Sequence, residues 1–418
     1  MFFRPRRSGA RSVVRAAALI LSAPVLSTIA LSTLVLSTLS AGVAHAQVAS
    51  APFNVTNPAY GANGNDTADD TQGIQNAINA VPSSGGEVYI PAGTYYLSGP
   101  LTVSNKPIAF RGEGARVTNL IRRGAGDGIV FTSSSSVNQG FAVRSMSFLR
   151  EDGGGGAAIS GSWPTPGAYA SLGPVTATIH DVHISAIPWD YNGRFWRAGI
   201  VLHNVTNAKI YAFNIHMTQS WPHAGQPDIE TGIDIKGASI NVQISDGDVS
   251  RMHRGVTVRD QSEAIFIKDV ETGEGEYGFH LWNAGRGSVI SGCHANMANG
   301  IRVENTSDVT ISNNLLFGNF GAEKNAIKIV NQSWAHGARF RITGNVMHAL
   351  SPMSNFGIVI DGYSTESLIQ GNSTSGMDVG IWLFNPNTTH YIVSGNRNWA
   401  SPNTFIDGGA GTLNVDNH

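Results

Sequence analysis

The chain has 418 residues, a formal net charge of −2, 49 glycines and a single cysteine, Cys293. A near-neutral chain with no long basic run after its N-terminal leader is not expected to bind nucleic acid. One cysteine excludes a disulfide within the chain, so packing must stabilise the fold. A buried structural thiol is expected at Cys293.

The first 46 residues are typical of an export signal. Five arginines lie within residues 4–15, an apolar run follows at residues 16–43, and Ala44-His45-Ala46 supplies the small residues of a cleavage site. We predict a signal peptide at 1–46 and a secreted or periplasmic protein, with an uncleaved membrane anchor as the alternative. No later stretch is apolar for long enough to span a bilayer.

A short capping helix is predicted near the start of the mature chain. Residues 60–71 are rich in turn formers, and Asp69, Asp70 or Thr71 can cap the helix that follows. Its apolar stripe consists of Ile74, Ala77, Ile78 and Val81. Residues 47–84 are therefore expected to cover the open N-terminal end of a β-structure, whose core and strand edges would otherwise meet water. The first strands follow at residues 87–97.

The following chain repeats one short phrase. It occurs as Gly232-Ile-Asp-Ile, Gly255-Val-Thr-Val, Gly278-Phe-His-Leu and Gly300-Ile-Arg-Val, at intervals of 23, 23 and 22 residues. A second apolar phrase, such as Ile290-Ser-Gly, lies between successive copies. Two strand-length phrases per period with no helical pattern between them predict an all-β fold, a parallel β-helix. Residues 385–418 are expected to form its C-terminal cap region.

The N-terminal segment resembles a known family. Tyr60-Gly-Ala, the Asp66-Thr-Ala-Asp-Asp-Thr run and Gly85-Gly-Glu-Val-Tyr-Ile-Pro-Ala-Gly-Thr-Tyr are similar to the signature of the pectate-lyase-like superfamily. That superfamily includes polygalacturonase-type hydrolases, pectate-lyase-3-type proteins and phage tailspike depolymerases. The resemblance implies a right-handed parallel β-helix. A dozen coils around one continuous core would need most of the mature chain, so residues 47–418 are predicted to form a single domain, with a polysaccharide as its expected partner.

Outward positions of the repeat are expected to form columns. Side chains alternate along a strand, and successive coils lie about 4.8 Å apart, so equal positions stack on the surface. One column contains Asp234, Thr257, His280 and Arg302, and the next contains Lys236, Arg259, Trp282 and Glu304. A merely solvated face would be rich in Thr, Ser and Asn, so this face is predicted to be functional.

A third stack precedes the repeat glycines. Glu230, His253 and Glu276 are each 23 residues from the next. Two coils therefore separate the carboxylates by about 9.6 Å, which is near the upper limit for the acid and base of an inverting glycosidase. A salt-linked turn ladder without catalysis is the alternative interpretation.

Comparison with family 28 polygalacturonases argues against their mechanism. In the glycine alignment the three catalytic aspartates of that family have no counterpart, and its histidine is replaced by Tyr277. Asn299-Gly300-Ile301-Arg302 keeps the pattern. The scaffold is similar to that family, but its hydrolytic machinery cannot be carried over.

The remaining residues suit proton abstraction from a uronate. Arg254, Arg302 and Lys236 are candidates to pair the substrate carboxylate. His253, His280 or Tyr277 are candidates for base and acid, because histidine titrates near neutral pH. Together with Glu230, Asp234 and Glu276, they form the predicted catalytic set.

Aromatic residues of the loops and middle coils are predicted to stack on sugar rings, which present an apolar C–H face. The candidates are Trp196, Trp221 and Trp282, with Lys236 and Arg259 as further substrate-binding residues.

Calcium is a further alternative. No cofactor is required by the patterns above, but Asp246, Asp248, Asp269 and Glu271 occupy matching positions of two adjacent coils, and clustered oxygen ligands suit Ca²⁺. Solvated turn carboxylates are the other interpretation.

A structural stack is also predicted. Asn314, Asn345, Asn372 and Asn396 each lie three residues after the apolar residue of the second phrase, which fits an asparagine ladder.

These patterns predict a carbohydrate-active protein that binds and cleaves a polysaccharide, with an anionic substrate and β-elimination favoured. A glycoside hydrolase with an altered carboxylate set and a non-catalytic glycan-binding β-helix are the alternatives.

Overall fold

The computed structural model describes residues 52–135, 139–152, 154–165, 176–187, 195–217, 231–284, 286–318, 325–332, 338–350, 355–399 and 403–418. The predicted export signal lies outside these residues. None of the helices within the described ranges is long and apolar enough to cross a membrane.

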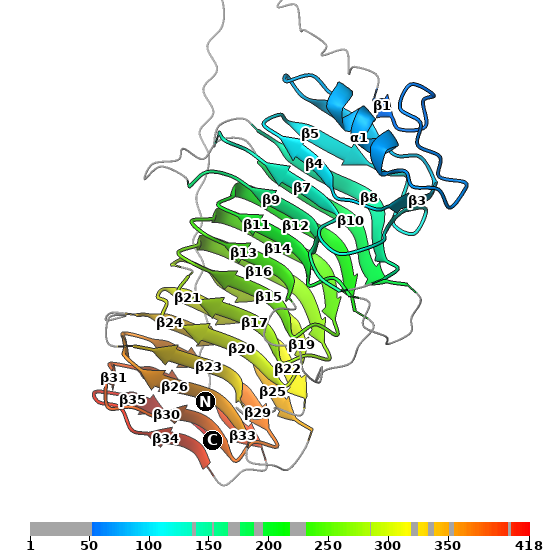
Figure 1. Cartoon of the computed structure of the whole chain (residues 1–418). Coiled ribbons are helices and arrows are strands. Elements are labelled where there is room, and N and C mark those ends of the chain that lie inside the picture. The colour runs from blue at the N-terminus through cyan, green and yellow to red at the C-terminus, as the bar shows by residue number, and fades with distance from the viewer. Residues whose placement is uncertain are drawn as a thin grey trace, which may run out of the picture. The chain divides into compact units, whose positions relative to one another are not determined.

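The described chain forms stacked coils of parallel strands, as predicted (Figure 1). One sheet, called sheet B, carries twelve strands in the described ranges: β4 (Leu101–Ser104), β7 (Ile129–Thr132), β9 (Ala157–Ser162), β11 (Ala198–His203), β13 (Thr231–Lys236), β15 (Arg254–Arg259), β17 (Tyr277–Trp282), β20 (Asn299–Glu304), β23 (Asn325–Asn331), β26 (Phe356–Gly362), β30 (Val379–Leu383) and β34 (Asn403–Asp407).

The other face of the coils is sheet A. Its N-terminal strands are β1 (Phe53–Asn54), β2 (Gly86–Tyr89), β3 (Gly93–Leu97), β5 (Ile108–Arg111), β6 (Thr118–Arg122), β8 (Phe141–Arg150), β10 (Ala177–Ala186), β12 (Thr206–His216), β14 (Ile240–Ser250) and β16 (Glu263–Gly273). Its later strands are β18 (Val289–Ser291), β19 (His294–Asn296), β21 (Val309–Ser312), β22 (Leu315–Gly318), β24 (Phe340–Thr343), β25 (Val346–Ala349), β28 (Leu368–Gln370), β29 (Ser373–Ser375), β32 (Ile392–Ser394), β33 (Arg397–Trp399) and β35 (Leu413–Val415). A small pair, β27 (Ser364–Thr365) and β31 (Thr388–Thr389), lies apart from both sheets.

Inward Ile, Val, Leu and Phe residues fill the space between the sheets. In β13, Ile233 and Ile235 are fully buried, and Phe279 and Leu281 of β17 occupy the equivalent positions with no exposed surface. The repeat glycine sits where the chain enters sheet B. A Cβ atom on Gly232 would lie 2.7 Å from the carbonyl oxygen of Gly255 in the next coil, so a side chain is excluded there.

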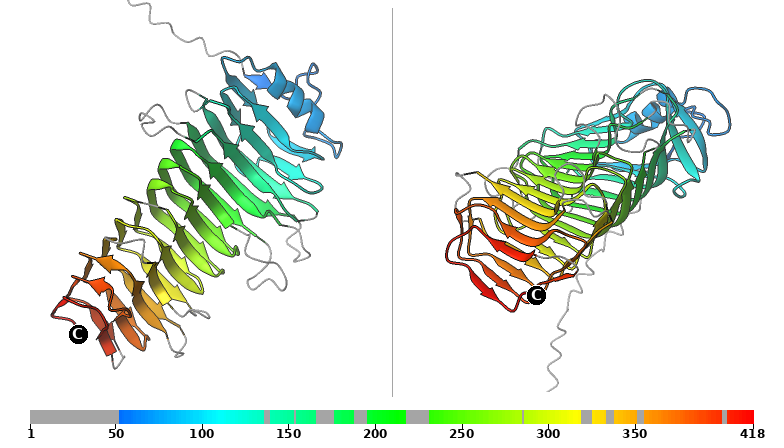
Figure 2. Two further views of the ribbon diagram at one scale, coloured as in Figure 1. Left: turned by 60° about the vertical axis from the view of Figure 1, so that its left-hand side comes forward. Right: turned by 90° about the horizontal axis from the view of Figure 1, so that it is seen from below.

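The predicted helix is α1 (Thr71–Ala80), and it lies at the N-terminal end of the coils (Figure 2). Ile74, Ala77 and Ile78 are fully buried, which accounts for the apolar stripe. Gln75 bonds the N–H of Thr102 in β4 at 2.9 Å, so the helix is joined to the first strand of sheet B.

Each long strand of sheet A bends at a left-handed residue. In β14 this residue is Asp246, with φ 54°, and in β16 it is Asp269, with φ 53°. Later coils place Gly292, Gly344 or Gly371 there, with φ between 64° and 66°. Aspartate and glycine tolerate this conformation best, so the two aspartates serve the corner of the coil.

The predicted asparagine ladder is confirmed. Asn345 is fully buried, its amide Nδ2 donates to Asn372 Oδ1 at 2.9 Å and to the Ile311 carbonyl at 3.0 Å, and its own Oδ1 accepts from Asn314. Asn417 extends the ladder beyond Asn396. At the other end, Asn314 accepts the N–H of Cys293, whose thiol is buried with its pKa raised to about 11 by desolvation. Cys293 is therefore a structural thiol.

Candidate functional site

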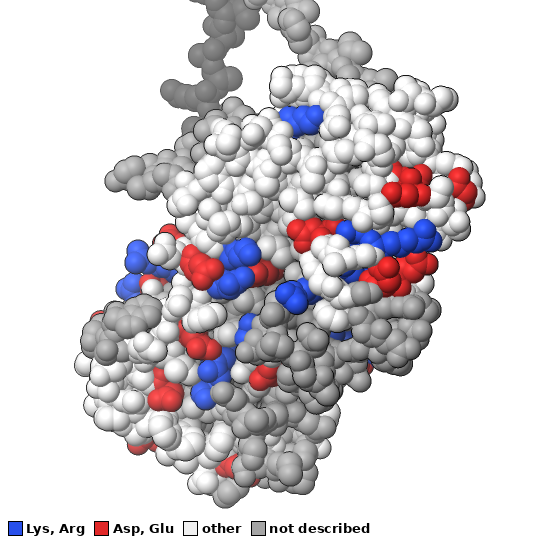
Figure 3. Space-filling model, in the orientation of Figure 1, with Lys and Arg blue, Asp and Glu red and all other residues white. Residues whose placement is uncertain are grey.

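The outward columns of sheet B form as predicted. The register pairs Val201 with Asp234, Asp234 with Thr257, Thr257 with His280 and His280 with Arg302. In the neighbouring column Arg259 pairs with Trp282, and Trp282 with Glu304. The stacking of coils therefore makes direct neighbours of residues that are 22 to 33 positions apart in the sequence. In the view of Figure 3, charged side chains of both signs gather over the middle coils, while the N-terminal end is mostly uncharged.

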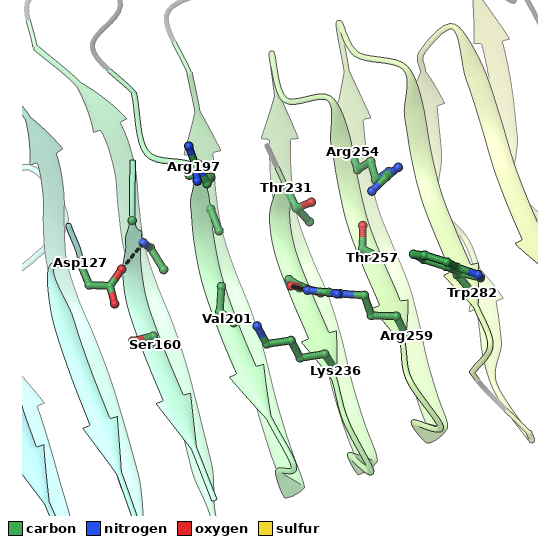
Figure 4. Close-up of a pocket in the computed structure, with 14 residues that line it drawn as sticks. Asp127, Ser160, Arg197, Val201, Thr231, Lys236, Arg254, Thr257, Arg259 and Trp282 are labelled. Atoms are coloured by element: carbon green, nitrogen blue, oxygen red, sulfur yellow. Dashed lines mark hydrogen bonds and ion pairs between the residues drawn. The ribbon is translucent and has the colours of Figure 1, made fainter. Parts of the chain in front are cut away.

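A cavity of about 670 Å³ opens across β9, β11, β13, β15 and β17 (Figure 4). Two rows of side chains flank it. Arg197, Thr231 and Arg254 stand at the strand starts, and Lys236, Arg259 and Trp282 stand at the strand ends. The middle row and the far wall consist of Asp127, Gly156, Ala157, Ser160, Ala198, Val201, Asp234 and Thr257.

The cavity is richer in cations than in carboxylates. Its cations are Arg197, Lys236, Arg254 and Arg259, and its carboxylates are Asp127 and Asp234. Arg197, Lys236 and Arg254 have no ion-pair partner within the described part of the chain. Three cations are therefore available to an anionic ligand.

Asp234 and Arg259 neutralise each other. The guanidinium donates to both carboxylate oxygens, at 2.9 and 2.8 Å, and Asp234 is 7% exposed. Hydrogen bonding to Asp234 raises the pKa of Arg259. A bidentate pair of this kind holds both side chains rigidly. Asp234 thus orients Arg259 along the cavity, and both of its carboxylate oxygens are hydrogen-bonded to that guanidinium.

A second group of predicted residues lies on the next coils, β17 and β20. His280 is 4% exposed, and its Nε2 lies 3.0 Å from Glu304 Oε1, which Arg302 Nε also contacts. Burial alone would raise the pKa of Glu304, but the bonds from His280 and Arg302 outweigh it and lower the pKa to about 2. Burial lowers the pKa of His280, helped by the nearby cations Arg254 and Arg302.

These shifts define the state of His280. An ionised Glu304 can only accept a hydrogen bond, so Nε2 of His280 carries the proton. With its pKa lowered, the ring is neutral at neutral pH, and Nδ1 keeps a free lone pair. This Nδ1 is buried and has no hydrogen-bond partner among the described residues.

Tyr277 links the two groups. Its ring stacks on those of His280 and His253, with centroids 5.2 and 6.2 Å apart. The guanidinium groups of Arg254 and Arg302 lie 5.9 and 5.6 Å from the ring centroid. The two arginines therefore approach the same aromatic ring from the strands on either side of β17 and place positive charge beside His280.

His253 contacts Glu276 directly, through Nε2 and Oε2. This contact matches the salt-linked ladder that was the alternative for this stack. The third member of the predicted stack, Glu230, lies outside the described residues, so the carboxylate separation expected for an inverting glycosidase stays a prediction.

Several buried polar atoms of this face lack partners in the described chain. They are Arg254 Nε, Thr257 Oγ1, His280 Nδ1 and Asn299 Oδ1. All four belong to β15, β17 and β20, next to the Tyr277 ring or the cavity. Because an unpaired buried polar group costs about 1–3 kcal/mol, such groups are typical of places that a ligand completes.

The predicted sugar platforms have different outcomes. Trp282 is 41% exposed and lines the cavity, as expected for a stacking surface. The prediction that Trp196 is a stacking platform is wrong. Its ring is fully buried, its Nε1 donates to the Ser185 carbonyl, and the Arg150 guanidinium lies 4.5 Å from the ring centroid. Its large apolar ring belongs to the core. Trp221 lies outside the described residues.

The four predicted calcium ligands do not form one ion site. Asp246 and Asp269 occupy the left-handed corners described above, Asp248 accepts bonds from Asn214 and Ser250, and Glu271 pairs with His294 at 3.2 Å. Across the described ranges, no group of three or more His, Cys, Asp or Glu side chains is arranged to hold a metal ion. These carboxylates also lie on sheet A, whereas the cavity lies on sheet B.

Four polar residues of the cavity were not predicted from the sequence: Asp127, Ser160, Arg197 and Thr231. Arg197 and Thr231 precede repeat glycines, as His253 and Arg254 do. The same alignment by glycines would therefore have placed them on this face. Asp127 comes from an irregular early turn, where it accepts the N–H of Ala157 at 2.7 Å, and no repeat signal marks it.

Two family models match the chain. One, described as rhamnogalacturonase A/epimerase, pectate lyase-like, matches residues 53–153, and the other, described as periplasmic copper-binding protein (NosD), matches residues 203–407. With the fold above, these matches confirm the resemblance to the pectate-lyase-like superfamily and its right-handed parallel β-helix.

Individual proteins are similar over different lengths. An iota-carrageenase from Alteromonas macleodii is 32% identical over 114 residues, which cover 22% of this chain and 23% of that protein. The match thus spans about 23% of the length of this curated relative.

Solved structures match over most of the chain. A GH87 α-1,3-glucanase from Streptomyces thermodiastaticus superposes with a TM-score of 0.62 at 15% identity, covering 88% of this chain and 69% of that one. The A-module of a mannuronan C-5 epimerase from Azotobacter vinelandii gives 0.56 at 14% identity, covering 87% and 99%. The tailspike of Pseudomonas phage phi297 gives 0.54 at 12% identity, covering 82% and 80%. At these identities the likeness concerns the fold.

Proposed function

We propose that this protein is a polysaccharide-processing enzyme that binds an anionic chain in the sheet B cavity and cleaves it by β-elimination. The observation that carries the proposal is the charge of the cavity. Four cations face two carboxylates there, and one of those carboxylates is already paired with Arg259, in a chain whose net charge is −2. A cavity more positive than the molecule as a whole favours an anionic ligand.

The similar proteins support a polysaccharide as the substrate. Those named above include a carrageenase, a glucanase and a mannuronan epimerase. Epimerisation at C5 of a uronate begins with removal of the proton next to the carboxylate, which is also the first step of β-elimination. A site built for that step fits the residues found here better than the aspartate set of polygalacturonases does.

In the proposed reaction, Arg254 and Arg302 pair the uronate carboxylate and stabilise the charge that develops on it. Once a movement of the side chains around it exposes His280 Nδ1 to the bound chain, this nitrogen takes the proton from the carbon next to the carboxylate, so an N–H bond forms and a C–H bond breaks. The released electron pair forms a C=C bond as the glycosidic C–O bond breaks. His280 then returns the proton to the leaving oxygen, and the ring is neutral again.

Glu304 acts in this scheme as a positioning residue. Its ionised carboxylate holds the proton of His280 on Nε2, and this leaves the Nδ1 lone pair for the substrate. The tautomer of a histidine is set by the bond its other nitrogen makes. We further propose that the protein works outside the cytoplasm, because residues 1–46 are typical of an export signal and one matching family model is described as periplasmic.

Product analysis tests the proposal. Purified protein is incubated with alginate, polygalacturonate and carrageenan, and the products are weighed and their ultraviolet absorbance followed. Elimination gives products that absorb in the ultraviolet and whose masses include no added water at the cut. Products heavier by one water per cut would contradict elimination in favour of hydrolysis. Binding without products would make the protein a glycan-binding module.

The variant His280→Ala tests the assignment of the base. Its rate should fall by about 10²–10⁴-fold, the usual worth of a general base. His348→Ala is the matched control, because His348 is exposed on sheet A and bonds only Ser375 in the described chain. Equal rates for the two variants would remove His280 from the mechanism.

A further inference from the structure

A cluster of aromatic rings lies on sheet B away from the cavity. It consists of Phe356, Trp382 and Phe384 and is called the distal aromatic cluster below. The rings of Phe356 and Trp382 are 5.2 Å apart at 48°, and those of Trp382 and Phe384 are 4.8 Å apart at 74°. Phe384 is 51% exposed, and the other two residues are half-buried. Large rings are thus kept at the surface although the core of the same coils is filled by aliphatic residues.

The cluster follows the column of His280. The register pairs His280 with Arg302, Arg302 with Lys328, Lys328 with Val359 and Val359 with Trp382. Phe384 continues the neighbouring column, because its N–H donates to the Ile360 carbonyl of the preceding coil. Trp282 at the cavity and Trp382 are therefore on the same face, and Figure 1 shows their strands, β17 and β30, in one series.

The distance between the cavity and the distal aromatic cluster matches the length of an oligosaccharide segment. Four strand steps lead from β17 to β30 through β20, β23 and β26. At about 4.8 Å per step they amount to about 19 Å, the length of several sugar residues. Two cations, Arg302 and Lys328, and two carboxylates, Glu304 and Asp361, lie between the two aromatic sites.

We propose that the distal aromatic cluster is a second binding subsite, which holds an anionic polysaccharide several residues away from the bond that is cleaved. This inference rests on the proposed function for the nature of the chain. The rings offer faces for the C–H surface of a pyranose, and the anionic nature of the chain is taken from the cavity. The shared face of sheet B and a spacing of several sugar residues from the cavity favour a polysaccharide over a partner protein.

The experiment compares a polymer with a trisaccharide of the same repeating unit. Trp382→Ala should raise KM for the polymer roughly tenfold, in line with the loss of one stacked ring, and leave kcat and the KM for the trisaccharide unchanged. Phe384→Ala should show the same pattern more weakly. Trp399→Ala is the matched control, since Trp399 is 58% exposed but lies on β33 of sheet A. Affinity electrophoresis in polymer-containing gels measures binding independently of cleavage.

Each outcome has one meaning. A polymer KM and gel retardation of Trp382→Ala equal to those of Trp399→Ala would overturn the subsite while leaving the proposed function intact. Equal loss on the trisaccharide would overturn it as well, because the cluster would then act on the cavity. Dissociation of an oligomer by Trp382→Ala, seen by light scattering, would make the cluster a protein interface and overturn the subsite.

If the wild type binds the polymer in a Trp382-dependent way without cleaving it, the subsite stands and elimination fails. No retardation of the wild type by any polysaccharide would overturn both proposals.

Discussion

Two groups of buried polar side chains lie along the coils, and their hydrogen bonds differ. In the asparagine ladder, each amide from Asn314 to Asn396 bonds the amide of the next coil and a backbone carbonyl. On sheet B, Thr257, His280 and Asn299 are also buried, yet each keeps an atom without a partner among the described residues.

Hydrogen-bond satisfaction can therefore distinguish structural from functional polar groups in a repeat fold. A polar group buried for stability has its bonds satisfied within the protein, since an unpaired group is costly. A group kept for a ligand carries that cost until the ligand arrives. Both groups occupy repeat positions of the coils, so their place in the repeat alone does not distinguish them.

The largest effect is expected in the ladder. Asn345→Ala removes the bonds to Asn372 and Ile311 and leaves the amide of Asn314 without its acceptor. Each buried unpaired group costs about 1–3 kcal/mol, so a loss of about 4 kcal/mol in the free energy of unfolding is expected. Urea denaturation followed by circular dichroism measures it. Asn296→Ala, at an exposed asparagine of β19, is the control and should stay within about 0.5 kcal/mol. A similar midpoint for both variants would contradict the structural role of the ladder.

The next effect concerns Glu304 and pH. Its folded pKa of about 2 lies below the ordinary value of 4.5, so the carboxylate stabilises the fold above about pH 4.5, and this contribution is lost as the pH falls toward 2. The shift corresponds to a contribution of about 3 kcal/mol at neutral pH. Glu304→Gln should therefore be less stable than the wild type at pH 7, and the difference should shrink below pH 4.5. Urea unfolding at a series of pH values checks this, and a difference that does not depend on pH would refute it.

The smallest effect on stability is expected for two buried threonines, one with a hydrogen-bond partner and one without. Thr257 and Thr374 are both 2% exposed, but Thr374 Oγ1 bonds Asn398 at 2.8 Å, whereas Thr257 Oγ1 has no partner in the described chain. Thr374→Val should destabilise the protein by about 1–2 kcal/mol. Thr257→Val should leave stability within about 0.5 kcal/mol, since no bond is lost, and lower kcat/KM about fivefold by removing a hydrogen bond to the substrate. The opposite pattern in the melting temperatures would contradict the division into satisfied and unsatisfied groups.

Much of the fold was predictable from local patterns. The glycine phrases, the alternation of inward residues such as Ile233 and Ile235, the helix stripe and the asparagine spacing each depend on a period that the chain itself carries. A period of about 23 residues places equal positions on adjacent coils, so the columns through Asp234 and His280 were correct in register.

The pairing of side chains was not contained in these periods. The repeat period predicts which residues are neighbours on adjacent coils. It does not predict that Arg259 pairs with Asp234 or that Glu304 bonds His280, because these contacts depend on side-chain conformations. The burial of Trp196 depends on Arg150 and Ser185 from another sheet, and Asp127 enters the cavity from a turn without a repeat. The sequence therefore specified the scaffold and the face of the site, since both follow from local periodicity. The charge balance and the unsatisfied atoms of that face emerged only once distant coils were packed together.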